Sequence, residues 1–166
     1  MALALLAAEY VVPLLATQPP TRALLEDVLR DDWSWMETRA PDVGKLYWDY
    51  MPQLMEEDTR LRDDALLPVL HCCLYAQSYF FWSAEGVMNL EHPGTVLGLG
   101  NDIAEVDESY LTRCLEIAVS VSPQPQQAAD WLNGLIAYMK HHHKQTSTNV
   151  IGSRLRRSDF AVPIIN

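Results

Sequence analysis

Apolar residues recur every three or four positions along most of the chain, which is the spacing of an α-helix. The segment 42–57 shows this clearly, with Val43, Tyr47, Tyr50 and Leu54 on one face. No segment shows convincing alternation of apolar and polar residues, the pattern of a half-buried strand. The sequence therefore predicts an all-α fold, a single bundle of about six helices.

Prolines and small polar residues predict where these helices begin and end. Pro19 and Pro20 end a first apolar segment over 2–16, and Pro52 is expected to kink or divide the third helix. In the second helix Asp32 falls within the apolar row, so it lies at the edge of that row or is paired. The expected N-terminal caps are Thr21 for the second helix, Asp58 or Thr59 for the fourth, and an Asp102–Glu105 capping box for the fifth.

The segment 65–84 contains no charged residue and has apolar side chains on nearly every side. Its length would span a bilayer, but His71, Gln77 and other polar residues dilute its hydrophobicity. We expect it to be the central helix, buried by neighbours all round. The apolar segment 2–16 lacks the basic start of a signal peptide, so we expect a core helix there too. No membrane association is predicted.

Charge divides the chain into two parts. The 166 residues carry 22 acidic and 12 basic side chains, for a net charge of −10. Residues 144–166 hold four basic residues against one acid, so this tail is +3 and residues 1–143 are −13. We therefore predict an acidic helical bundle over 1–143 and a mostly irregular, basic and apolar tail over 144–166. A bundle with this much negative charge repels the phosphate backbone of DNA or RNA, which argues against a nucleic-acid partner.

The cysteines predict a reducing compartment. Only Cys72, Cys73 and Cys114 are present, an odd number without the spacing of a disulfide framework. Reduced thiols in the cytoplasm are the simplest interpretation.

We find no motif that carries catalysis. His71 has no carboxylate three or four positions away, as a metal-binding helix pair would need. The run 141–143 is all histidine, but consecutive helical residues point about 100° apart and do not converge on one metal. The sequence contains no recognisable phosphate-binding loop and no nucleophile–histidine pair. We therefore assign no catalytic residue, metal or cofactor, and lean against an enzyme.

The leading functional prediction is a non-enzymatic protein that binds another, basic protein. One concrete form is an acidic inhibitor or immunity-type protein that neutralises a basic toxin. Aromatic residues are enriched at interface hot spots, and acids steer basic partners. The predicted contacts are Asp31, Asp32, Trp33, Trp35, Tyr47 and Trp48, with a second surface on the tail formed by Arg154, Arg156, Arg157 and Phe160. The tail is expected to fold onto the body or onto a second copy, which would make a homodimer.

The alternative function is the binding of a ligand inside the bundle. A helical bundle can hold a small molecule or a metal in an internal pocket, and can act as an enzyme there. The residues expected to line such a pocket are His71, Tyr75, Tyr79, Glu85 and His92.

Overall fold

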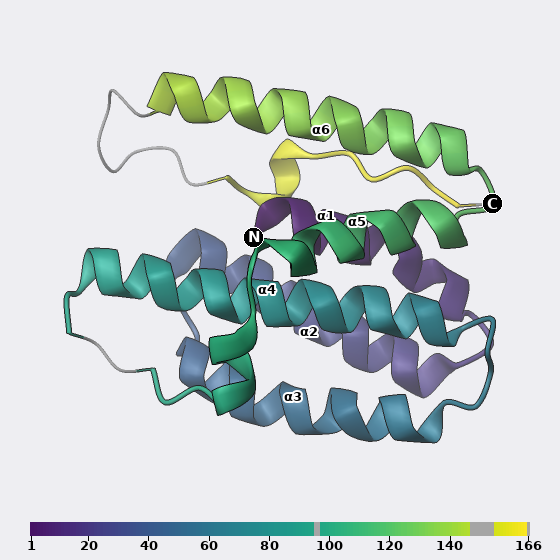
Figure 1. Ribbon diagram of the computed structural model, residues 1–166, viewed down its shortest axis with the longest axis horizontal. Helices are drawn as coiled ribbons and strands as arrows, with labels where there is room; N and C mark the ends of the chain where they lie inside the picture. The colour runs from purple at the N-terminus through teal and green to yellow at the C-terminus, as the bar shows by residue number, and fades with distance from the viewer. Residues whose placement is uncertain (95–96, 147–154, 166) are drawn as a thin grey trace.

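The computed structural model describes residues 1–94, 97–146 and 155–165, without the side chains of 142–146. Within these ranges the chain forms six α-helices, three short 3₁₀ helices and no strand, which confirms the all-α prediction (Figure 1). The α-helices are α1 (Ala2–Val11), α2 (Pro19–Thr38), α3 (Val43–Arg60), α4 (Leu67–Glu91), α5 (Glu108–Val121) and α6 (Pro125–Thr146). The 3₁₀ helices are η1 (Val12–Leu15), η2 (Asn101–Glu105) and η3 (Arg157–Asp159).

Helix α4 is the central element, as the uncharged segment predicted. It packs against α1, α3 and α5 and runs through the middle of the molecule (Figure 1). Its fully buried residues include Leu70, Cys72, Phe80 and Phe81. The helix continues beyond the uncharged segment to Glu91. None of the helices in the described part of the chain is long and apolar enough to cross a membrane.

Helix α1 is the second buried element. Every residue from Ala2 to Val11 is buried except Glu9, and the helix contacts α2, α4, α5 and α6. A helix that is apolar all round needs neighbours all round, which α1 has. Glu9 is its one charged side chain, and it faces the edge of the core.

Two of the expected helix caps are wrong because the helices begin elsewhere. Helix α2 begins at Pro19, where a proline costs no hydrogen bond, so Thr21 lies inside its first turn. The buried Thr21 hydroxyl instead donates to Glu57 on α3 at 2.5 Å. Asp58 and Thr59 do not cap α4, because α3 continues through them to Arg60.

The fifth helix also starts later than predicted. Asp102 and Glu105 belong to η2, and the N-cap of α5 is Asp107, whose carboxylate accepts the Ser109 backbone N–H at 2.8 Å. Pro52 does not divide α3, which runs unbroken from Val43 to Arg60.

The described part of the tail returns to the body and lies beside α6 (Figure 1). Phe160 is buried and joins the core that the helices share. The Trp131 indole on α6 donates to the Ala161 carbonyl at 3.2 Å. Apart from the single turn η3, residues 155–165 are irregular, in agreement with the prediction.

Candidate functional site

Helices α2 and α3 carry the six body residues predicted to contact a partner, and the structure buries most of them. Four are 5% exposed or less, so their side chains are not available to a partner in this conformation: Asp32, Trp33, Trp35 and Tyr47. Asp31 is half-buried, and its carboxylate accepts the Tyr50 hydroxyl at 2.5 Å. Trp48 is the exception, with 59% of its surface exposed.

Asp32 and Trp35 belong to the core. The Trp35 ring packs edge-to-face on Phe80, with centroids 5.5 Å apart. Asp32 is paired, because the Gln77 amide donates to its Oδ2 at 2.5 Å, while Asp32 Oδ1 and Gln77 Oε1 have no hydrogen-bond partner. Burial raises the pKa of Asp32 well above its ordinary value, which favours the neutral acid. Their roles are therefore structural.

Trp48 is exposed but held in place. Its indole N–H donates to the Gly98 carbonyl at 2.9 Å, and its ring packs edge-to-face on Tyr47 at 5.0 Å between centroids. Tyr47 is fixed in turn by its hydroxyl, which donates to Asp102 at 2.5 Å. Burial, together with Asp102, raises the pKa of Tyr47 to about 12, so this hydroxyl keeps its proton. Trp48 thus presents a large aromatic surface in a fixed orientation, and its side chain has little conformational freedom.

Trp48 is part of an exposed apolar row on α3. Pro52 and Met55 follow it at helical spacing, and Met55 is 53% exposed. The exposed acids Asp49 and Glu56 each come one residue after a member of this row, so they lie beside it. We call Trp48, Asp49, Pro52, Met55 and Glu56 the α3 face.

The predicted tail surface is partly used inside the molecule. Arg157 Nε donates to Glu9 Oε2 at 2.5 Å, and the Arg157 backbone N–H donates to Glu37 Oε1 at 3.0 Å. The buried Phe160 ring lies 6.2 Å from Trp33 and 5.7 Å from Tyr138, measured between ring centroids. The structure therefore brings Trp33 together with Arg157 and Phe160.

The remaining members of the tail surface differ from these two. The Arg156 side chain is exposed, and Arg154 lies outside the described residues. The described tail contacts its own body, and a dimer through the tail remains a prediction.

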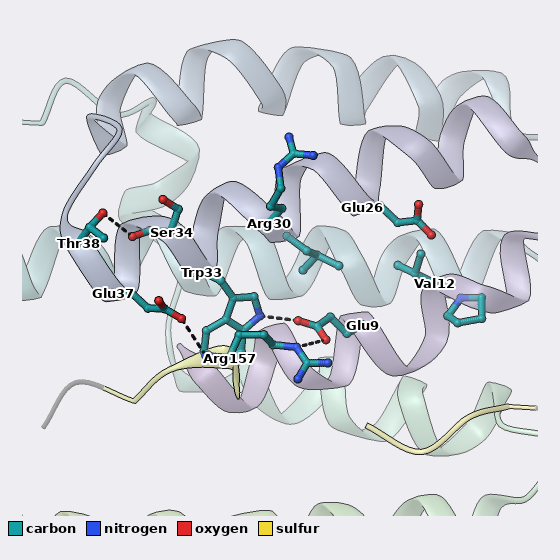
Figure 2. Close-up of a pocket in the computed structure, with 11 residues that line it drawn as sticks. Glu9, Val12, Glu26, Arg30, Trp33, Ser34, Glu37, Thr38 and Arg157 are labelled. Carbon is teal, nitrogen blue, oxygen red and sulfur yellow. Dashed lines mark hydrogen bonds and ion pairs between the residues drawn. The ribbon is translucent and has the colours of Figure 1, made fainter. Parts of the chain in front are cut away.

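Where α1, η1 and α2 meet the tail there is an open groove of about 570 Å³, within the range of ligand sites. Figure 2 shows Trp33, Glu9 and Arg157 converging at its middle. We call it the α1–α2 groove. Its lining residues are Glu9, Val12, Pro13, Glu26, Leu29, Arg30, Trp33, Ser34, Glu37, Thr38 and Arg157.

Glu9 is the polar centre of the α1–α2 groove. Its carboxylate accepts the Trp33 indole N–H and the Arg157 guanidinium, both at 2.5 Å. Burial raises the pKa of Glu9, while Arg157 and the Trp33 hydrogen bond act against that rise. Sequence reasoning did not select Glu9, although it is the one charged residue in an otherwise apolar segment. That isolation was the available signal, since a lone acid in a buried helix needs a partner.

The five residues of the alternative pocket do not gather around one cavity. They lie on or next to α4 from residue 71 to residue 92, a rise of roughly 31 Å. None of them lines the α1–α2 groove or the two smaller hollows at Gln124–Asp130 and between α5 and α6.

Their individual contacts are structural. Half-buried His71 pairs with Asp58 across 2.9 Å. Tyr75 packs edge-to-face on Tyr110, and Tyr79 lies against Trp82. Glu85 is half-buried, and His92 is exposed beyond the end of α4.

The cysteines and metal-binding side chains add no reactive centre. All three cysteines are buried and free, and the sulfurs of Cys72 and Cys114 lie 3.6 Å apart. The contact with Cys114 and burial raise the pKa of Cys72, and burial raises the pKa of Cys73, so both thiols are poor nucleophiles. Among the described residues no group of three or more His, Cys, Asp or Glu side chains could hold a metal ion.

Searches with this chain against protein-family models, curated proteins and solved structures find no match.

Proposed function

We propose that this protein acts by binding a basic protein in the cytoplasm, without catalysis, and that the α3 face is the contact. The observation that carries the proposal is Trp48, which is 59% exposed although its ring packs on Tyr47 and its N–H is hydrogen-bonded. Holding a large aromatic in place before binding reduces the entropy lost on association. Such residues are typical centres of protein interfaces.

The surroundings of Trp48 favour a basic partner. Asp49 and Glu56 lie beside the apolar row, and the bundle as a whole is strongly acidic. Apolar contact at the centre with acids at the rim is the ordinary anatomy of an interface. The acids would speed capture of a cationic partner, as in an inhibitor or immunity-type protein that neutralises a basic toxin.

The test is capture from the native cell's lysate by immobilised protein, quantified by mass spectrometry. Wild type is compared with W48A/M55A, and L90A serves as the control because Leu90 is 84% exposed on a different helix. We expect wild type and L90A to retain one basic protein in stoichiometric amount. The double variant should lose at least about 30-fold of its affinity, as for a hot-spot residue worth about 2 kcal/mol or more.

Two controls make the result decisive. Thermal unfolding should show that W48A/M55A is folded, which the exposure of both side chains leads us to expect. Raising the salt concentration should weaken capture, because exposed charges are screened. If W48A/M55A captures the same protein as well as wild type does, the α3 face is not the contact; if no variant captures a stoichiometric partner, the proposal fails.

A further inference from the structure

The α1–α2 groove has the shape and composition of a peptide site. Val12, Leu29 and Trp33 form an apolar floor, and acids stand along its length from Glu26 to Glu37. These two acids are eleven residues apart on α2, a rise of about 16 Å. Extended chain covers that distance in about five residues, at about 3.3 Å per residue.

The chain's own tail shows which chemistry this surface accepts. Arg157 places its guanidinium on Glu9 and its backbone N–H on Glu37, at 2.5 and 3.0 Å. The residue before it, Arg156, is extended, with φ −110° and ψ 151°. Arg157 itself begins the 3₁₀ helix η3, so the chain approaches the groove in extended form and an arginine side chain already fits one part of it. Of the described tail residues only Arg157 lines the groove, so no described tail residue lines the part near Val12, Pro13 and Glu26.

The charges around the groove favour a cation. Among the described residues, the lining itself holds three carboxylates, from Glu9, Glu26 and Glu37, against two guanidinium groups, from Arg30 and Arg157.

Nearby arginines are already engaged elsewhere. Arg30 points away from Glu9 and pairs with Asp27 on its own helix at 2.6 Å (Figure 2). Glu26 extends toward Val12, and its present partner is the partly exposed Arg22 at 2.7 Å. Exposed pairs of this kind contribute little to stability, so a ligand cation can replace Arg22 on Glu26.

We infer that the α1–α2 groove binds a short extended peptide segment of another protein, with a basic side chain on Glu26 and an apolar side chain on the floor. Alternate residues of an extended peptide point to the same side, so a cation–apolar–cation pattern at every second residue fits the groove. This site is separate from the α3 face and does not depend on the function proposed for it.

The experiment uses the full chain labelled with ¹⁵N and the peptide acetyl-Arg-Ser-Leu-Ser-Arg-amide. The reporter is the Trp33 indole N–H, which lies in the groove and donates to Glu9. We expect its NMR signal to shift saturably with the basic peptide and to stay in place with acetyl-Glu-Ser-Leu-Ser-Glu-amide. The variant W48A/M55A should bind the basic peptide as wild type does, which separates this site from the α3 face.

Two conservative variants locate the cation. Glu26 is exposed, so E26Q should fold and should raise the dissociation constant of the basic peptide about two- to fivefold. E105Q removes an exposed acid from η2, outside the groove, and should leave the constant unchanged. The inference is overturned if the basic peptide produces no saturable shift, if the acidic peptide binds equally well, or if E26Q binds as tightly as wild type.

Discussion

Helices α2 and α3 each carry a tryptophan next to an aspartate, and the two pairs have opposite environments. Asp32 and Trp33 on α2 are buried, whereas Trp48 and Asp49 on α3 are exposed. Both indoles donate a hydrogen bond, Trp33 to a carboxylate and Trp48 to a backbone carbonyl. Residue type and hydrogen bonding therefore do not separate a core tryptophan from a contact tryptophan. The covering elements do, since the tail places Phe160 on Trp33 and leaves it buried, whereas Trp48 stays 59% exposed with the Tyr47 ring against it.

The largest expected difference is in the cost of deleting each indole. Trp33→Ala should lower the free energy of unfolding by about 3–5 kcal/mol, because it leaves a cavity in the core and removes a donor from Glu9. Trp48→Ala should cost less than about 1 kcal/mol, since most of that side chain is already in water. Urea denaturation of both variants measures the difference. If Trp33→Ala does not fold, Trp33→Phe replaces it, with a smaller loss expected; equal costs for the two sites would contradict the comparison.

The aspartates should differ in the pH dependence of stability. Burial raises the pKa of Asp32 in the folded state, so folding favours its protonated form. That contribution is fully present below the unfolded pKa of about 3.9 and is lost as the pH rises toward the folded value. Between these two pKa values, each rise of one pH unit lowers the free energy of unfolding of wild type by up to about 1.4 kcal/mol relative to a variant without a titrating group at this position.

Asp32→Asn is that variant, and its amide can also donate to the unpartnered Gln77 Oε1. We expect the free energy of unfolding of Asp32→Asn, relative to that of wild type, to be higher at pH 7 than at pH 5. Urea denaturation at both pH values measures it. Asp49→Asn changes the exposed aspartate beside Trp48, and its free energy of unfolding should depend on pH in the same way as that of wild type. If Asp32→Asn also has the pH dependence of wild type, Asp32 does not take up a proton on folding.

The sequence predicted those parts of the fold that depend on local pattern. The absence of charge over 65–84 identified the central helix, and the position of Asp32 in an apolar row indicated that it is paired or at an edge. The helix caps were missed where two acids or hydroxyls compete, as with Asp102 and Asp107, because the spacing alone does not select one. The burial of Trp33 could not be predicted, since part of its cover is Phe160, 127 residues later in the chain. The α1–α2 groove was missed for the same reason, because α1, α2 and the tail form it together.

The smallest expected effect tests whether the tail holds Trp33 in its buried state. Arg157 and Arg156 are neighbours with the same charge, but only Arg157 pairs with Glu9. Because the Arg157 side chain is 37% exposed, solvent screens this pair, and Arg157→Ala should cost only about 0.5–1 kcal/mol. Arg156→Ala should cost less than about 0.5 kcal/mol, since its side chain is exposed.

A local measurement is more sensitive here than global unfolding. Hydrogen exchange at the Trp33 indole N–H, followed by NMR, should be faster in Arg157→Ala than in wild type and unchanged in Arg156→Ala, because local opening of the tail exposes Trp33. Equal exchange in the two variants would mean that net charge, and not the Arg157–Glu9 pair, keeps the tail on the body. Faster exchange in Arg157→Ala alone would show that the environments of Trp33 and Trp48 differ partly through one ion pair made by a distant segment.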